Sequence, residues 1–169
     1  MVKMDVLKKL TPEKQIEFLH GAYTGVDGVW FIVCEDEYDF DTALYLDGEV
    51  WRRFAKILAK RVKKMFDIEG EDARTVADTI VLRWTMEKWK FEVMEYGPKK
   101  SVLRVLSCPW LEGLRRSSRE KFAPKICDPV CEIVYHTWSE GINPKIKVEK
   151  PKKMGMGDEY CDFVFTLED

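Results

Sequence analysis

The sequence carries little net charge of either sign. Lysine plus arginine number 28 and aspartate plus glutamate number 30, giving a formal net charge of −2 over 169 residues. A net charge this small gives the protein no overall electrostatic attraction to polyanions, so we expect no nucleic-acid or membrane partner. The N-terminal segment also lacks the apolar run of a signal peptide or membrane span, because charged residues interrupt it. We therefore expect a cytoplasmic protein.

Histidine is scarce, and the cysteines lack a common metal-binding spacing. His20 and His136 are the two histidines, and neither has a second histidine at metal-ligand spacing. Five cysteines, an odd number in a chain without an export signal, argue against a disulfide framework and favour free thiols. Their spacing is not that of one CxxC pair followed by another, so the signal for a zinc site is moderate.

Four of the five cysteines nevertheless fall in the last third of the chain: Cys108, Cys127, Cys131 and Cys161. Thiolates gathered from separate elements can hold a soft metal or react with a substrate. We expect these thiols to converge on folding, with zinc as the first candidate cofactor and an iron–sulfur cluster as the second. The alternative is that each thiol packs in the core as a small hydrophobic group.

Helical patterns dominate residues 1–88. Thr11 and Pro12 predict a helix start, and apolar residues recur at helical spacing over 41–66, with a possible break at Gly48. Asp72 belongs to the acidic start of a third helix. The segment Asp27-Gly28-Val29-Trp30-Phe31 fits either a hairpin turn or part of a buried helix.

Strand patterns begin after residue 88. Apolar residues alternate on both sides of Gly97-Pro98, which predicts a β-hairpin, and two further alternating segments begin at Ile146 and Cys161. Two helical segments lie between the strand pairs. The order β-β-α-α-β-β predicts an α+β fold, with an antiparallel sheet covered on one face by helices, in a single domain spanning 1–169.

Cys127 and Cys131 allow two interpretations. If both lie on one helix, they form an apolar stripe with Val134 and Trp138, which indicates ordinary core packing. If Asp128 caps a helix that begins at Pro129, Cys131 lies in the first turn, where free N–H groups favour a thiolate. We favour the second interpretation.

Three motifs together resemble a group of largely uncharacterised prokaryotic proteins. They are Asp27-Gly28-Val29-Trp30-Phe31, then Cys108-Pro109-Trp110 with Arg115, and Asn143-Pro144 followed by the segment from Gly157 to Phe163. That group is similar to the L-2-amino-thiazoline-4-carboxylate hydrolase family. Residues 89–167 also resemble the 4-vinyl reductase domain of small-ligand sensors.

The resemblance implies a helical start packed on the β-β-α-α-β-β unit, a homodimer, and a ligand pocket between helices and sheet. It also implies a structural zinc, for which Cys131 or Cys127, Glu149 and Cys161 match three ligand positions. At the fourth position Met154 replaces the expected cysteine. A thioether is a poor zinc ligand, so Cys108 or the second helix cysteine would have to complete the set.

Two functions follow from these expectations. The first is small-molecule binding in a pocket lined by aromatic residues, with an arginine available for a ligand carboxylate: Trp30, Trp84, Trp110, Arg115 and Tyr135. The alternative is a hydrolase that opens a small sulfur or nitrogen heterocycle, using Cys108, Cys127 or Cys131 as nucleophile and Asp158 or Glu149 to assist. The sequence leaves open whether the protein is an enzyme.

Overall fold

The computed structural model describes residues 5–169. Within them the chain divides into two compact units, one that ends at Ala43 and one that comprises Leu44–Asp169. Helix α2, Phe40–Met65, runs across the division. The single domain expected from the sequence stays a prediction, and each unit is described by itself.

The first unit contains a 3-10 helix, Asp5–Lys9, helix α1, Pro12–Glu37, and the start of α2. The helix start expected at Thr11 is confirmed, because the Thr11 hydroxyl accepts a hydrogen bond from the Lys14 backbone N–H at 3.3 Å. Residues 27–31 lie inside α1, so the hairpin-turn interpretation of that segment is wrong.

Helix α2 continues through Gly48, and the break considered there does not occur. A Cβ at Gly48 would lie 3.0 Å from Cδ1 of Ile133. The absence of a side chain therefore lets α2 pack closely against the helix that carries Ile133.

Helix α3, Ala73–Met86, begins as its acidic start predicted. The Asp72 carboxylate accepts hydrogen bonds from the Thr75 backbone N–H at 2.8 Å and from the Thr75 hydroxyl at 2.9 Å. This cap satisfies a donor that the first turn of a helix would otherwise leave unpaired.

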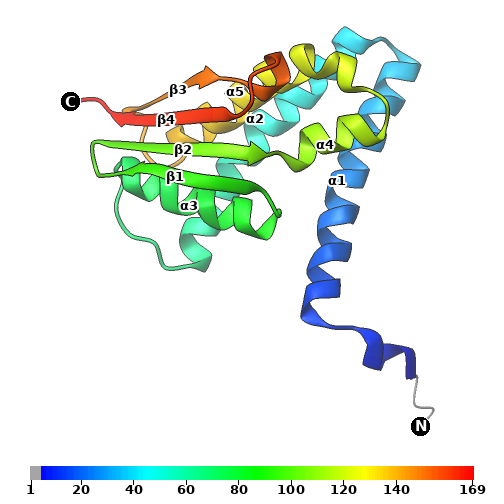
Figure 1. Ribbon diagram of the computed structural model, residues 1–169, viewed down its shortest axis with the longest axis horizontal. Helices are drawn as coiled ribbons and strands as arrows, with labels where there is room; N and C mark the ends of the chain where they lie inside the picture. The colour runs from blue at the N-terminus through cyan, green and yellow to red at the C-terminus, as the bar shows by residue number, and fades with distance from the viewer. Residues whose placement is uncertain (1–4) are drawn as a thin grey trace. The chain divides into compact units, whose positions relative to one another are not determined.

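Four strands form one antiparallel sheet: β1, Lys90–Tyr96; β2, Lys100–Ser107; β3, Ile146–Lys152; and β4, Cys161–Leu167. Their spatial order is β1-β2-β4-β3, so β3 lies at an edge (Figure 1). The expected α+β class and the β-β-α-α-β-β order are confirmed.

Two helices join the strand pairs: α4, Pro109–Arg116, and α5, Ala123–Glu140, with a 3-10 turn, Glu120–Phe122, between them. Helix α5 begins six residues before Pro129, so our preferred helix start at Pro129 is wrong. Pro124 supplies the first-turn proline instead, and Pro129 lies within the helix. Cys127 and Cys131 therefore share one continuous helix.

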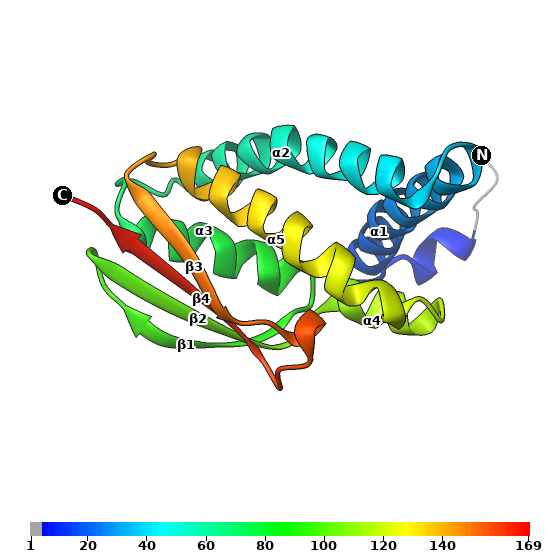
Figure 2. The same ribbon diagram turned by 90° about the horizontal axis from the view of Figure 1, so that it is seen from above.

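Helices α3 and α5 lie against one face of the sheet, and α2 lies on their far side (Figure 2). The largest fully buried side chains in this layer are those of Trp84, Trp138, Phe163 and Phe165. No helix in residues 5–169 combines the length and apolar character needed to cross a bilayer.

Candidate functional site

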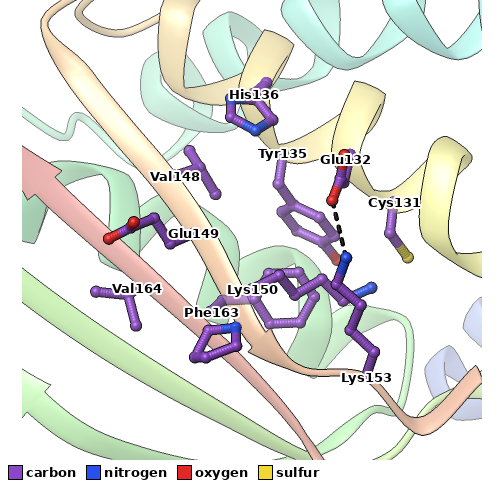
Figure 3. A pocket seen from close by; sticks show the side chains of 11 residues that line it. Cys131, Glu132, Tyr135, His136, Val148, Glu149, Lys150, Lys153, Phe163 and Val164 are labelled. Carbon is purple, nitrogen blue, oxygen red and sulfur yellow. Dashed lines mark hydrogen bonds and ion pairs between the residues drawn. The ribbon is translucent and has the colours of Figure 1, made fainter. Parts of the chain in front are cut away.

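A pocket with a volume of about 430 Å³ opens between α5 and the edge of the sheet. Helix α5 contributes four lining residues, and β3 and β4 contribute most of the others (Figure 3). The lining comprises Cys131, Glu132, Tyr135, His136, Val148, Glu149, Lys150, Pro151, Lys153, Phe163 and Val164. The wall thus divides about evenly between apolar or aromatic residues and charged or polar ones, which suits a ligand with both an apolar body and a polar group.

Lys150 lies in this pocket at a β-bulge. Glu149 pairs with Val164 and Lys152 with Asp162, so Lys150 and Pro151 together face the single residue Phe163 on β4. Proline is tolerated here because β3 is an edge strand, where the missing N–H leaves no ladder bond unmade. Bulges often redirect a side chain beside a functional site.

The Lys150 ammonium group lies among thiols and an aromatic ring. Its nitrogen is 5.2 Å from the centre of the Phe163 ring, and its side chain hydrogen-bonds Cys131. Burial alone would lower the pKa of Lys150, but charge interactions with Cys131 and Cys161 and the hydrogen bond raise it above its ordinary value. Lys150 therefore carries a positive charge at neutral pH.

The structure brings the four predicted cysteines into electrostatic range of one another. Cys108 interacts with Cys131 and Cys127, and both Cys127 and Cys161 interact with Cys131. Burial raises the pKa of Cys127 to about 12 and also raises the pKa values of Cys108 and Cys161. These three thiols are therefore protonated at neutral pH, whereas Cys131 lies in the pocket wall beside the lysine.

The loop before β4 packs against two of these cysteines. The Met154 backbone N–H donates to the Cys161 sulfur at 3.1 Å. A Cβ at Gly155 would lie 2.6 Å from the Cys127 Cβ, so only glycine fits at this approach. The segment in which Met154 replaces the cysteine implied by the resemblance thus donates a backbone N–H to Cys161 and packs closely on Cys127 at Gly155.

The predicted metal ligands do not form a metal site in the described residues. Within 5–169, no three His, Cys, Asp or Glu side chains are arranged to hold an ion. Glu149 points away from Cys131 (Figure 3), and its carboxylate pairs with Lys147 at 3.0 Å. Lys150, the residue after Glu149, instead places its positive charge beside Cys131. Zinc binding by these residues therefore stays a prediction.

Tyr135 and Trp84 connect the pocket to the core. The Trp84 indole N–H donates to the Tyr135 hydroxyl at 2.7 Å, and the Tyr135 and Phe163 ring centres are 4.4 Å apart. Trp84 is fully buried and does not belong to the lining, whereas Tyr135 does. Burial raises the pKa of Tyr135 well above its ordinary value, so the phenol stays neutral.

The other predicted ligand-binding residues lie elsewhere. Trp30 is on α1 in the first unit and is 40% exposed. Trp110 packs edge-to-face against Trp51, with ring centres 5.4 Å apart. Arg115 is held on the surface by Glu120 at 2.8 Å and Glu112 at 3.2 Å. None of these three residues lines the pocket described above.

The sequence reasoning missed Lys150, Lys153, His136 and Phe163 as lining residues. One signal for Lys150 was present, because it shares the inward phase of Ile146 and Val148 on β3. Lys153 pairs with Glu132 at 3.0 Å across the mouth of the pocket (Figure 3). His136 was set aside because it is five residues from Cys131, yet both line the same space.

Residues 9–167 match the family of unknown function DUF6125. The chain belongs to this family. No curated protein matches it with a significant score. The hydrolase and 4-vinyl reductase families named from the short motifs remain resemblances.

Two solved structures are similar in fold. One is a trafficking protein particle complex subunit 3 from Naegleria fowleri covalently bound to palmitic acid. Its TM-score is 0.58 at 11% identity, covering 90% of this chain and 97% of that chain. The other is an H-NOX domain from Shewanella oneidensis in the Fe(II)CO ligation state, with TM-score 0.47, 15% identity and coverage of 82% and 74%. At such identities the likeness concerns the fold alone.

Proposed function

We propose that the protein binds a small organic acid in the pocket between α5 and β3. The observation that carries this proposal is the position of Lys150, which lies in the pocket wall at a bulge of β3, over the ring of Phe163. A ligand with a carboxylate and an apolar or aromatic body would match a cation beside Phe163, Val148 and Tyr135.

The surroundings of Lys150 favour an anionic ligand. Its side chain hydrogen-bonds Cys131, and the nearby Cys127 and Cys161 are neutral thiols at physiological pH, because burial raises their pKa values. By contrast, the nearby Lys153 already pairs with the carboxylates of Asp128 and Glu132. A ligand carboxylate would therefore give Lys150 the charged partner that Lys153 already has.

We expect small aromatic acids such as benzoate and phenylacetate to raise the melting temperature, and their neutral amides to have little effect. Lys150→Met should weaken acid binding by about 10–100-fold, since a hydrogen bond to a charged group contributes about 1.5–3 kcal/mol. Thermal-shift titrations followed by calorimetry would measure this loss.

Lys147→Met is the matched control. Lys147 lies on the same strand but outside the lining, and its side chain pairs with Glu149. This variant should bind acids as the wild type does. Equal binding by acids and amides, or undiminished binding by Lys150→Met, would contradict the proposal.

A second candidate function is the opening of a small heterocycle by Cys131. It is supported by one observation, namely that Cys131 lies in the pocket wall, where a substrate could reach it, and hydrogen-bonds the Lys150 side chain. The predicted assisting groups fit less well. Asp158 binds Lys152 and the Lys153 backbone outside the lining, and Glu149 pairs with Lys147.

Iodoacetamide should label Cys131 before the other cysteines of the second unit. Cys108, Cys127 and Cys161 are protonated thiols whose pKa values burial raises, whereas Cys131 borders an open pocket. Peptide mass spectrometry after timed labelling would give the order, and Cys131→Ser should abolish the fast phase. Uniform slow labelling would exclude Cys131 as a nucleophile. Turnover of an aminothiazoline carboxylate that Cys131→Ser abolishes would favour the hydrolase.

The cofactor and location expected from the sequence also stay predictions. Metal analysis of anaerobically purified protein would detect zinc, and its visible spectrum would detect an iron–sulfur cluster. Fractionation of cells that express the protein would test the cytoplasmic location.

The homodimer implied by the resemblance is a further proposal. Large apolar side chains on α1 support it, among them Phe18, Leu19, Val26 and Val29, each more than 60% exposed. Exposed apolar groups on this scale mark a protein-interaction surface more often than an ordinary solvated face.

A further inference from the structure

Three glycines lie in the interior of α1 without a packing reason inside the protomer. They are Gly21, Gly25 and Gly28, and a Cβ built at any of them would meet nothing within 4 Å. Glycine within a helix costs about 1 kcal/mol relative to alanine. The first unit taken by itself would therefore be more stable with alanine at each position, so nothing within that unit accounts for the glycines.

The glycines belong to a continuous seam along the helix, which we call the glycine seam: Phe18, Gly21, Gly25, Gly28 and Ile32. These residues follow one another at alternating steps of three and four, the spacing of a helix–helix seam. Phe18 is 73% exposed and Ile32 is 40% exposed. The seam is thus a shallow groove with a large apolar side chain at each end.

An apolar ridge runs beside the glycine seam at the same steps: Leu19, Ala22, Val26, Val29 and Val33. All five ridge residues are exposed. The apolar residues that α1 buries, Phe31 and Cys34, lie elsewhere on the helix. A ridge beside a groove is the arrangement with which one helix packs into another.

We propose that the glycine seam docks on the same seam of a second copy, with the two α1 helices antiparallel. This inference rests on the homodimer proposed above and names its interface. Phe18 lies seven residues before Gly25 and Ile32 lies seven residues after it. A two-fold axis at Gly25 therefore places each Phe18 opposite the partner copy's residue 32, as an isologous interface requires.

Charge favours the antiparallel arrangement. The C-terminal end of α1 carries Glu35, Asp36 and Glu37 in succession. A parallel pair would bring two such acidic ends together, and like charges across an interface disfavour association. In the antiparallel pair Asp36, eleven residues after Gly25, lies opposite Lys14, eleven residues before it.

Sedimentation equilibrium of the full chain tests the interface. We expect a dimer for the wild type and at least a tenfold higher dissociation constant for Gly25→Leu, because a bulky side chain separates the two helices. Since the space around Gly25 is open, this variant should keep or raise its melting temperature at monomeric concentrations. An intact fold with a weakened dimer identifies an interface effect.

Charge reversal tests the orientation. Lys14→Glu and Asp36→Lys should each weaken the dimer, and the double variant Lys14→Glu/Asp36→Lys should recover it. Recovery supports the antiparallel pair, whereas additive weakening excludes it.

The possible failures are distinguishable. A wild type that stays monomeric at all concentrations overturns both the homodimer and the seam. A wild-type dimer that Gly25→Leu leaves unchanged overturns the seam alone. The organic-acid proposal is measured on Lys150 and is not affected by either result.

Discussion

Glu87→Ala is expected to lower the free energy of unfolding by about 3–5 kcal/mol, the range for breaking a buried ion pair from one side. Arg83 Nε donates to Glu87 Oε1 at 2.8 Å, and the two side chains are 6% and 11% exposed. The other carboxylate oxygen accepts the Trp89 indole N–H at 3.0 Å. Urea unfolding followed by circular dichroism would measure the loss.

An exposed pair on α2 provides the control. Glu49 and Arg52 form a similar helical ion pair at 2.9 Å, but their side chains are 32% and 53% exposed. Solvent-exposed pairs typically contribute less than about 1 kcal/mol. Glu49→Ala should therefore change stability by about 0.5 kcal/mol or less. Similar losses for the two variants would show that the Arg83–Glu87 pair is solvated.

The buried polar contacts of α3 also position the pocket. Besides the Glu87 pair, Trp84 donates to Tyr135, and the Trp138 indole donates to Thr79 at 2.9 Å. Directional bonds of this kind fix the rotation of α5 relative to α3 more narrowly than apolar packing alone. Tyr135 and its neighbour His136 consequently face the edge of the sheet, where the pocket opens.

Local signals predicted most of the fold. Thr11 and Asp72 begin helices because each places a side-chain oxygen where the first turn needs an acceptor, which is a property of a few adjacent residues. The alternation of apolar and polar residues predicted the strands, because it too is a property of a few adjacent residues. The errors concern a glycine and a proline that the sequence suggested would break or begin a helix, whereas tertiary packing determines where the helices run. Gly48 serves a close contact with Ile133, and Pro129 is tolerated inside α5.

The sequence predicted less of the candidate site than of the fold. The expectation that remote cysteines converge followed from their gathering in the last third of the chain, and the structure places Cys108, Cys127 and Cys161 within electrostatic range of Cys131. Alternation along β3 places Lys150 on the inward side with Ile146 and Val148, but its position opposite Phe163 depends on the pairing register of β3 with β4, which is a long-range property. A half-buried lysine also departs from the expectation that a lysine-rich strand is solvated.

Phe163→Ala is expected to lower the free energy of unfolding by about 3–5 kcal/mol, as large-to-small changes in a core commonly do. Phe163 is 1% exposed and contacts the rings of Tyr135 and Trp84, with centres 4.4 and 5.4 Å away. The same change removes the ring beneath Lys150 and enlarges the pocket. Unfolding in urea gives the stability, and thermal shift with phenylacetate gives the binding.

Phe165→Ala separates these two effects. Phe165 lies two residues further along β4, faces the same side and is fully buried, but it does not line the pocket. Its replacement should cost a similar free energy and leave the ligand-induced shift intact, while Phe163→Ala should lose that shift. If both variants bound the acid equally well, the ring beside Lys150 would be a core residue without a part in recognition, and the ligand would have to bind elsewhere.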